Sequence, residues 1–130
     1  MTKDDYIKYW IKTSDDDWKR VELLAEKRDY IFALFCLHLS LEKQAKALWV
    51  KEHKSNFPPK IHNLLALVEN SSLLLSEGQL RFLDQLNQFQ LEGRYPDYQG
   101  KIHKIATQKL VKEFTEKAKE FKLCIHKALE

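Results

Sequence analysis

The sequence contains few of the residues that make tight turns. Glycine and proline occur only three times each among 130 residues. A β-sandwich or β-barrel needs a turn about every 8–12 residues, and such turns are rich in glycine and proline. The scarcity of both residues therefore argues against an all-β fold and predicts a few long helices joined by few loops.

Cysteine is almost as rare, with only Cys36 and Cys124 in the chain. Both fall in apolar stretches, so we expect buried free thiols, because an unpaired cysteine behaves as a small apolar residue. Two cysteines provide no disulfide framework and no CxxC redox or zinc motif. The five histidines are not spaced as metal ligands either. The sequence thus predicts no metal site and no cofactor.

Long hydrophobic runs and a targeting segment are also missing. Residues 1–5 are mostly polar, and the longest apolar run, Ile31–Leu41, is interrupted by His38. A membrane-spanning helix needs about 20 apolar residues, and a secretory signal needs an apolar core. We therefore expect a soluble cytoplasmic protein with no membrane segment. The net charge of +3, from 22 basic and 19 acidic residues, does not by itself indicate nucleic-acid binding.

Hydrophobic periodicity predicts one domain, residues 1–130, of the all-α class. Apolar residues recur at spacings of three and four, and the second helix is apolar on nearly every face, as expected for a central helix. A capping box at Ser76 and Gln79 marks the start of the fourth helix, and Gly93 is a natural end for it. The predicted ranges are 3–27, 29–53, 62–69, 76–93 and 107–129. This pattern predicts an up-and-down bundle of four long helices plus one short helix, with a loop over residues 92–105.

One polar strip stands out in the apolar second helix. His38, Glu42 and Lys46 follow one another at intervals of four residues, so they lie on one face of that helix. One interpretation is a solvated strip with a Glu–Lys pair. The other is a polar pocket between helices, where bundles often bind ligands.

Three further residues are candidates for binding. His62 follows Pro58-Pro59 and is interpreted either as a cap or surface histidine or as a functional group. Arg94, followed by Tyr95-Pro96, suits a phosphate or an acidic partner because the guanidinium group is a planar, bidentate donor. The alternative for Arg94 is a surface side chain that covers apolar area with its stem.

Four segments follow one another in a characteristic order: Trp18–Val21, the helix Phe35–Leu48 with His38, Glu42 and Lys46 before Ala47-Leu48, Pro58–Leu64 and Arg94–Asp97. Taken together, they resemble the HEPN domain (the nucleotide-binding domain of higher eukaryotes and prokaryotes). The resemblance extends over nearly the whole chain. It implies a helical bundle that forms a homodimer and that, as in many relatives, pairs with a minimal nucleotidyltransferase in a toxin–antitoxin type of system.

Active members of this family are metal-independent RNases with an arginine and a histidine separated by four to six residues. In that chemistry the histidine transfers protons and the arginine stabilises phosphate charge. No such pair occurs in this sequence; Arg94 and His103 come nearest, with eight residues between them. The missing motif weighs against an enzyme.

Three functions are consistent with the sequence. The first is a binding module for a nucleotide or RNA that pairs with a nucleotidyltransferase. The alternative is a metal-independent RNase toxin that uses Arg94 and His103, and a third reading is a structural dimerisation module without a ligand. The ligand-binding residues predicted for the first function are His38, Glu42, Lys46, His62, Arg94 and Tyr95.

Overall fold

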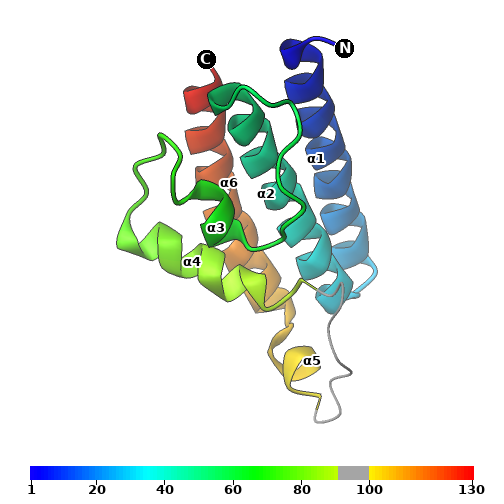
Figure 1. Cartoon of the computed structure of the whole chain (residues 1–130). Coiled ribbons are helices and arrows are strands. Elements are labelled where there is room, and N and C mark those ends of the chain that lie inside the picture. The colour runs from blue at the N-terminus through cyan, green and yellow to red at the C-terminus, as the bar shows by residue number, and fades with distance from the viewer. Residues whose placement is uncertain (91–99) are drawn as a thin grey trace.

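The computed structural model describes residues 1–90 and 100–130, and these residues form helices and connecting segments without a β-strand. Figure 1 shows how the helices are arranged. The six helices of the described residues are α1 (Lys3–Glu26), α2 (Tyr30–Glu52), α3 (Leu64–Val68), α4 (Glu77–Asn87), α5 (Lys101–Ile105) and α6 (Gln108–Leu129).

The connection between α1 and α2 is a tight turn. The backbone N–H of Asp29 donates to Leu24 O at 2.9 Å, and the N–H of Arg28 donates to Ala25 O at 3.0 Å. These bonds form a Schellman motif, in which Arg28 takes the left-handed conformation with φ 64°. The Asp29 side chain then caps α2 by accepting from Phe32 N at 3.4 Å. This turn folds α2 back along α1.

Small polar side chains join α1 to α2 where the two helices pack. Ser14 Oγ donates to Ser40 O at 2.7 Å, and Gln44 Nε2 donates to Ser14 Oγ at 2.9 Å. All three residues are fully buried. The single long first helix expected from the apolar stripe is confirmed, and Ser14 lies in its middle rather than at the start of a new helix.

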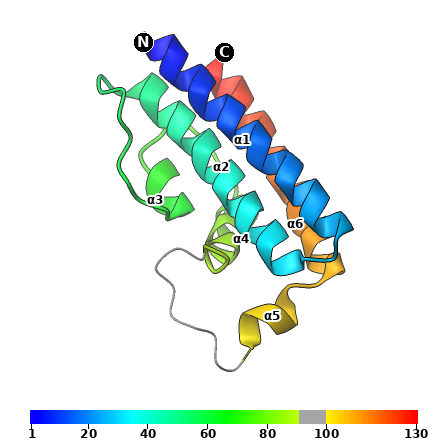
Figure 2. The same ribbon diagram turned by 90° about the vertical axis from the view of Figure 1, so that its right-hand side faces the viewer.

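Two lysine side chains show in which directions the long helices run. Lys3 Nζ, at the start of α1, donates to His53 O at the end of α2 at 2.7 Å, so α1 and α2 are antiparallel. Lys51 Nζ, near the end of α2, donates to Ala128 O near the end of α6 at 2.6 Å, so α2 and α6 are parallel. This direction agrees with the expected up-and-down order, in which the second and fourth long helices run the same way, because residues 53–107 return the chain to the other end of α2. α4 departs from that order, since it lies across the other long helices instead of along them. Figures 1 and 2 show this course, with α4 lying across the long helices and both termini at one end.

The core forms around α2, as its all-round apolar sequence predicted. α1, α3, α4 and α6 contribute one buried face each, and in α6 that face carries Val111, Phe114, Ala118, Phe121 and Ile125. Phe82 of α4 packs edge-on against Phe114 with ring centroids 5.2 Å apart. Cys36 is buried as expected, whereas Cys124 is half-buried.

The described residues contain one short helix more than predicted. α5 lies in the segment expected to be a loop, where Gly100 with φ 64° precedes a single turn and Ile102 packs against the core. α3 begins at Leu64, later than predicted, because Asn63 is its N-cap and accepts from Ala66 N. α4 ends at Asn87, earlier than the predicted end at Gly93, because the chain turns at Gln88 and Phe89. Gly93 itself lies outside the described residues.

Candidate functional site

Four of the residues predicted to bind a ligand meet at the Glu42 carboxylate. Lys46 Nζ donates to Glu42 Oε2 at 2.9 Å, and His62 Nδ1 donates to Glu42 Oε1 at 3.0 Å. His38 Nδ1 lies 3.8 Å from the same Oε1 atom. His38, Glu42 and Lys46 are 0%, 4% and 6% exposed, whereas the His62 side chain is 38% exposed. We call these four residues the Glu42 cluster.

Two elements and a loop position the Glu42 cluster. The four-residue spacing on α2 places His38, Glu42 and Lys46 on one face, and the segment before α3 carries His62 onto that face. From α1, the Trp10 ring lies 5.6 Å from Lys46 Nζ, a distance at which a cation is attracted to an aromatic face. Lys46 is therefore held between an aromatic ring and a carboxylate.

An asparagine pair extends the Glu42 cluster toward α4. Asn87 Oδ1 accepts from Leu64 N at 3.0 Å, and Asn87 Nδ2 donates to Asn63 Oδ1 at 3.0 Å. Since Leu64 N–H is a donor, the oxygen of Asn87 faces it. His38 Nε2, which lies 3.2 Å from the same oxygen, must then donate. Neutral His38 thus carries its proton on Nε2, and its Nδ1 atom faces Glu42.

Burial keeps His38 in this neutral form. Desolvation lowers the pKa of His38 below its ordinary value of 6.5, although the hydrogen bond to Asn87 and the charge of Glu42 oppose the shift. A histidine enclosed on every side loses its hydration when it takes up a proton. The charge of Glu42 offsets only part of this loss, so the pKa of His38 stays below its ordinary value.

The structure corrects the interpretation of the polar strip as solvated. The strip is buried, although the expected pairing of Glu42 with Lys46 is present. Glu42 is not among the residues that line the cavities of about 350, 420, 260 and 80 Å³ formed by the described residues. His103 is exposed on α5, a helix that contributes no residue to the cluster, and Arg94 and Tyr95 lie outside the described residues.

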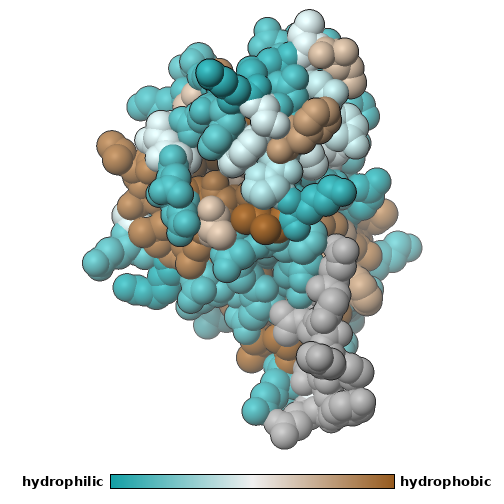
Figure 3. Space-filling view, viewed as in Figure 1, coloured by the Kyte–Doolittle hydropathy of each residue, from teal (hydrophilic) through white to brown (hydrophobic). Residues whose placement is uncertain are grey.

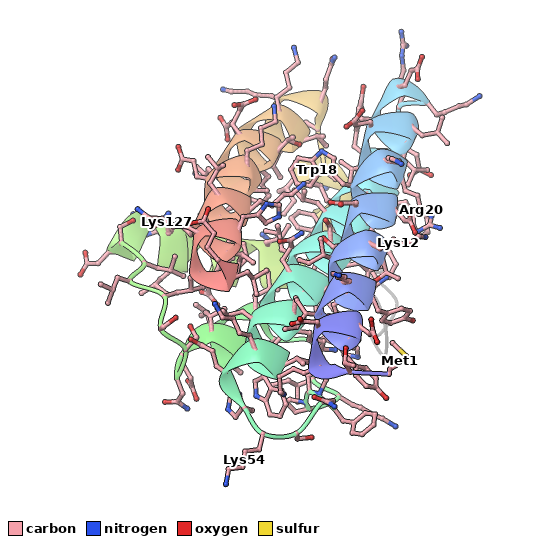
Figure 4. The ribbon with its side chains drawn as sticks, turned by 90° about the horizontal axis from the view of Figure 1, so that it is seen from above. Met1, Lys12, Trp18, Arg20, Lys54 and Lys127 are labelled. Atoms are coloured by element: carbon pink, nitrogen blue, oxygen red, sulfur yellow. The ribbon has the colours of Figure 1, made fainter. Side chains whose placement is uncertain are left out.

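A second buried carboxylate was not singled out from the sequence. Asp17 of α1 is 2% exposed, and it pairs with Arg20 at 2.7 Å and with Lys43 of α2 at 2.6 Å. The sequence feature that could have pointed to Asp17 is Lys43, a charged side chain on the mainly apolar helix α2. Figure 4 shows Arg20 on the side of α1 that faces away from α6, and Trp18 on the side that faces α6. The pair of Asp17 with Lys43 joins α1 to α2, whereas the pair with Arg20 lies within α1.

Cavities lie away from both carboxylates. One of about 350 Å³ lies between α4 and α6, and one of about 260 Å³ lies between α1 and α6. In residues 1–90 and 100–130, no group of three His, Cys, Asp or Glu side chains is arranged to hold a metal ion. Across the same residues, none of the helices combines the length and apolar composition of a membrane span.

Sequence comparison matches the HEPN domain over residues 7–127. The chain belongs to the HEPN domain family. The resemblance seen in the four sequence segments is thereby confirmed. A search of curated proteins gives no match. Among solved structures, this HEPN domain is similar to the crystal structure of TT1696 from Thermus thermophilus, with a TM-score of 0.79 and 17% identity over 94% of this chain and 97% of that one. At this identity the likeness shows the fold alone.

Proposed function

We propose that this HEPN domain is a non-catalytic binding module for a nucleotide or RNA and that its protein partner is a nucleotidyltransferase. The observation that carries the proposal is the pairing of both Glu42 oxygens, with Lys46 and with His62, inside the protein. A general base must be able to reach the proton of a substrate, and a carboxylate that is 4% exposed and bonded at both oxygens serves as a structural anchor instead.

Within this proposal the residues of the Glu42 cluster have two roles. His62 keeps 38% of its side chain exposed, so it is the member that contacts the ligand, together with Arg94 and Tyr95. His38, Glu42 and Lys46 act as positioning residues that hold His62 in one orientation. We call the exposed surface around His62 the His62 face.

The test is calorimetric titration with ATP and GTP and with their mono- and diphosphates. We expect binding by the parent protein, weaker binding by His62→Ala, and unchanged binding by His126→Ala, an exposed histidine of α6. Affinity purification of the tagged protein from its native cells should recover a nucleotidyltransferase. Absence of both nucleotide binding and a copurifying transferase would disprove the proposal.

The alternative is a metal-independent RNase toxin that uses Arg94 and His103. The favourable observation is that His103 is exposed on α5, directly after the segment that contains Arg94. The test is RNA cleavage in EDTA by the parent and by Arg94→Ala, combined with growth of cells that express each protein. Cleavage and growth arrest by the parent alone would replace the binding module with the RNase.

A further inference from the structure

His38 faces Glu42 with a ring nitrogen that has no hydrogen-bond partner among the described residues. This nitrogen, Nδ1, is buried and lies 3.8 Å from Glu42 Oε1, beyond the roughly 3.2 Å reach of an N–H···O bond. The proton of the neutral ring is on Nε2, which donates to Asn87. Nδ1 is therefore an acceptor. Since the carboxylate oxygen that it faces is also an acceptor, the two atoms repel each other.

A proton on Nδ1 would reverse the sign of this interaction. Because Nε2 already carries a proton, a second one on His38 can enter only at Nδ1, which then becomes a charged donor facing Glu42 Oε1. Charged N–H···O bonds are about 2.7–2.9 Å long, so the gap of 3.8 Å should close by about 1 Å. Glu42 is thereby drawn toward His38 and away from His62, which donates to the same oxygen at 3.0 Å.

Charge decides which partner Glu42 loses. A carboxylate oxygen accepts two bonds, so the conflict is between like charges: at acidic pH three cations, His38, Lys46 and His62, would surround one carboxylate. His38 and Lys46 are 0% and 6% exposed, so neither can exchange Glu42 for water, whereas the His62 side chain is 38% exposed and can turn toward solvent. The pKa of His38 agrees with this repulsion, since after desolvation, its main cause, the charge of His62 also lowers it.

Among the described residues, the charged groups that face His38 come from two segments. α2 contributes Glu42 and Lys46, and the segment before α3 contributes His62. α3 and the buried face of α6 carry no charged side chain, and the buried carboxylate of α1 is already paired with two cations. α4 faces His38 with the uncharged Asn87, and its charged residues are exposed: Glu77, Arg81 and Asp84.

We infer that His38, Glu42 and His62 form an acid-sensitive switch, in which proton uptake by His38 Nδ1 moves the Glu42 carboxylate from His62 to His38 and releases the His62 side chain toward solvent. The backbone stays in place, because Asn87 Oδ1 accepts from Leu64 N at 3.0 Å independently of Glu42. The switch does not require that His62 contacts a ligand. Where the proposed function holds, it makes the His62 face depend on pH.

The experiment is an NMR titration of the ¹⁵N-labelled protein from neutral to acidic pH, without added ligand, in which the ring nitrogens of all five histidines are observed. The ring shifts distinguish the two neutral tautomers and the protonated form. His38→Gln and His62→Gln are the test variants. His126→Gln is the matched control, since it removes an exposed histidine of α6. Circular dichroism at each pH reports whether the helices remain folded.

At neutral pH we expect the proton of His62 on Nδ1 and that of His38 on Nε2. As His38 takes up its second proton, the hydrogen-bonded Nδ1 proton of His62 should be lost, while the Leu64 amide shift and the circular dichroism stay unchanged. In His38→Gln, His62 should keep its bond to a lower pH, until Glu42 itself is protonated. In His62→Gln, the pKa of His38 should rise, because a neighbouring positive charge is gone. His126→Gln should titrate as the parent does.

A His62 bond that persists after His38 is protonated would overturn the switch, and so would its loss at one and the same pH in the parent and in His38→Gln. The parent titration alone decides the first point, so the test stands even where a variant does not fold. Loss of helical circular dichroism in the step in which His38 titrates, or a His38 ring that stays neutral until the protein unfolds, would also overturn it. None of these outcomes bears on the nucleotide titrations at neutral pH, which test the proposed function separately.

Discussion

The Glu42 carboxylate joins α2 to the segment before α3 through its charged interactions. Lys46 and His62 bond its two oxygens, and Lys46 also lies against Trp10 of α1. A buried carboxylate in protein interiors is tolerated only when its oxygens are bonded. Removing one partner of such a pair leaves a buried charge without compensation, which is the costly state.

Replacing Glu42 by alanine should therefore destabilise the protein by about 3–5 kcal/mol, the usual loss when one partner of a buried pair is removed. Glu42→Gln, which keeps the shape, should cost less. Urea unfolding followed by circular dichroism measures both. The control is Lys12→Ala, whose exposed pair with Asp16 should contribute no more than about 1 kcal/mol. Equal losses in Glu42→Ala and Lys12→Ala would contradict the structural role of the cluster.

His38 should make stability depend on pH. Because burial lowers its pKa below 6.5, the unfolded chain takes up this proton at a higher pH than the folded protein does. Stability should thus fall as the pH decreases through 6.5, until His38 is also protonated in the folded protein. His38→Gln should flatten this part of the profile, whereas the exposed His126→Gln should leave it unchanged. Urea midpoints across this range provide the measurement, and parallel profiles for parent and His38→Gln would refute the assignment.

Part of the Glu42 cluster could be predicted from the sequence, because three of its residues lie close together on one helix. The spacing of His38, Glu42 and Lys46 along one helix determines that they share a face. The contact of His62 with Glu42 depends on the path of a loop, which no periodicity encodes. Asn87 was missed as well, because a polar residue near the end of α4 looks like any exposed helix position until its bond to Leu64 N is seen.

Among the elements, the α1–α2 turn carries a residue in an unfavourable conformation. Arg28 has φ 64°, a region that a residue with a Cβ atom enters at a cost of about 1–2 kcal/mol relative to the right-handed one. Arg28→Gly should therefore stabilise the protein by up to about 1 kcal/mol after the extra chain entropy of glycine is included. Thermal unfolding tests this. Lys27→Gly, at φ −81°, is the control and should destabilise instead.

The packing of α1 on α2 relies on the buried Ser14. Ser14→Ala should cost about 1–3 kcal/mol, because it leaves Gln44 Nε2 without its acceptor at 2.9 Å. Thr13→Ala is a suitable comparison, since the Thr13 hydroxyl bonds only the backbone of its own helix. Chemical denaturation of both variants gives the two costs, and a Ser14→Ala protein as stable as the parent would show that the network contributes little.

For the helices, prediction from the sequence was correct where it depended on residues close together in the chain, such as a helix cap or an apolar stripe. The capping box of Ser76 and Gln79 is present as predicted, and the predicted apolar stripe of α6 is the buried face of that helix. α5 was not predicted, because one helical turn is too short to show a periodicity. The crossing of α4 over the long helices was missed because the course of the 53–107 connection depends on tertiary packing.

At the scale of the whole molecule, exposed apolar side chains bear on whether the chain associates with a second copy. Figure 3 shows apolar side chains on the left of this face, over the segment that leads into α4. Leu74 in that segment is 98% exposed, and Leu123 of α6 is 70% exposed. Exposed apolar side chains of this size are common at protein–protein contacts, which agrees with the homodimer that the family resemblance implies.

We therefore expect the purified protein to elute with twice the mass of one chain in size-exclusion chromatography with light scattering. Its melting temperature should also rise when the protein concentration is raised tenfold, because association stabilises the folded state by mass action. A single-chain mass together with a melting temperature independent of concentration would exclude the homodimer under those conditions.

The short connection between α1 and α2 also has a consequence for the order of folding. Three residues join two helices that pack along most of their length, and closing so short a loop loses little entropy. This hairpin should form early, whereas α6 must be brought from a distant part of the chain to pack against both α1 and α2. In stopped-flow experiments Ser14→Ala should slow folding, while Phe121→Leu in α6 should mainly speed unfolding.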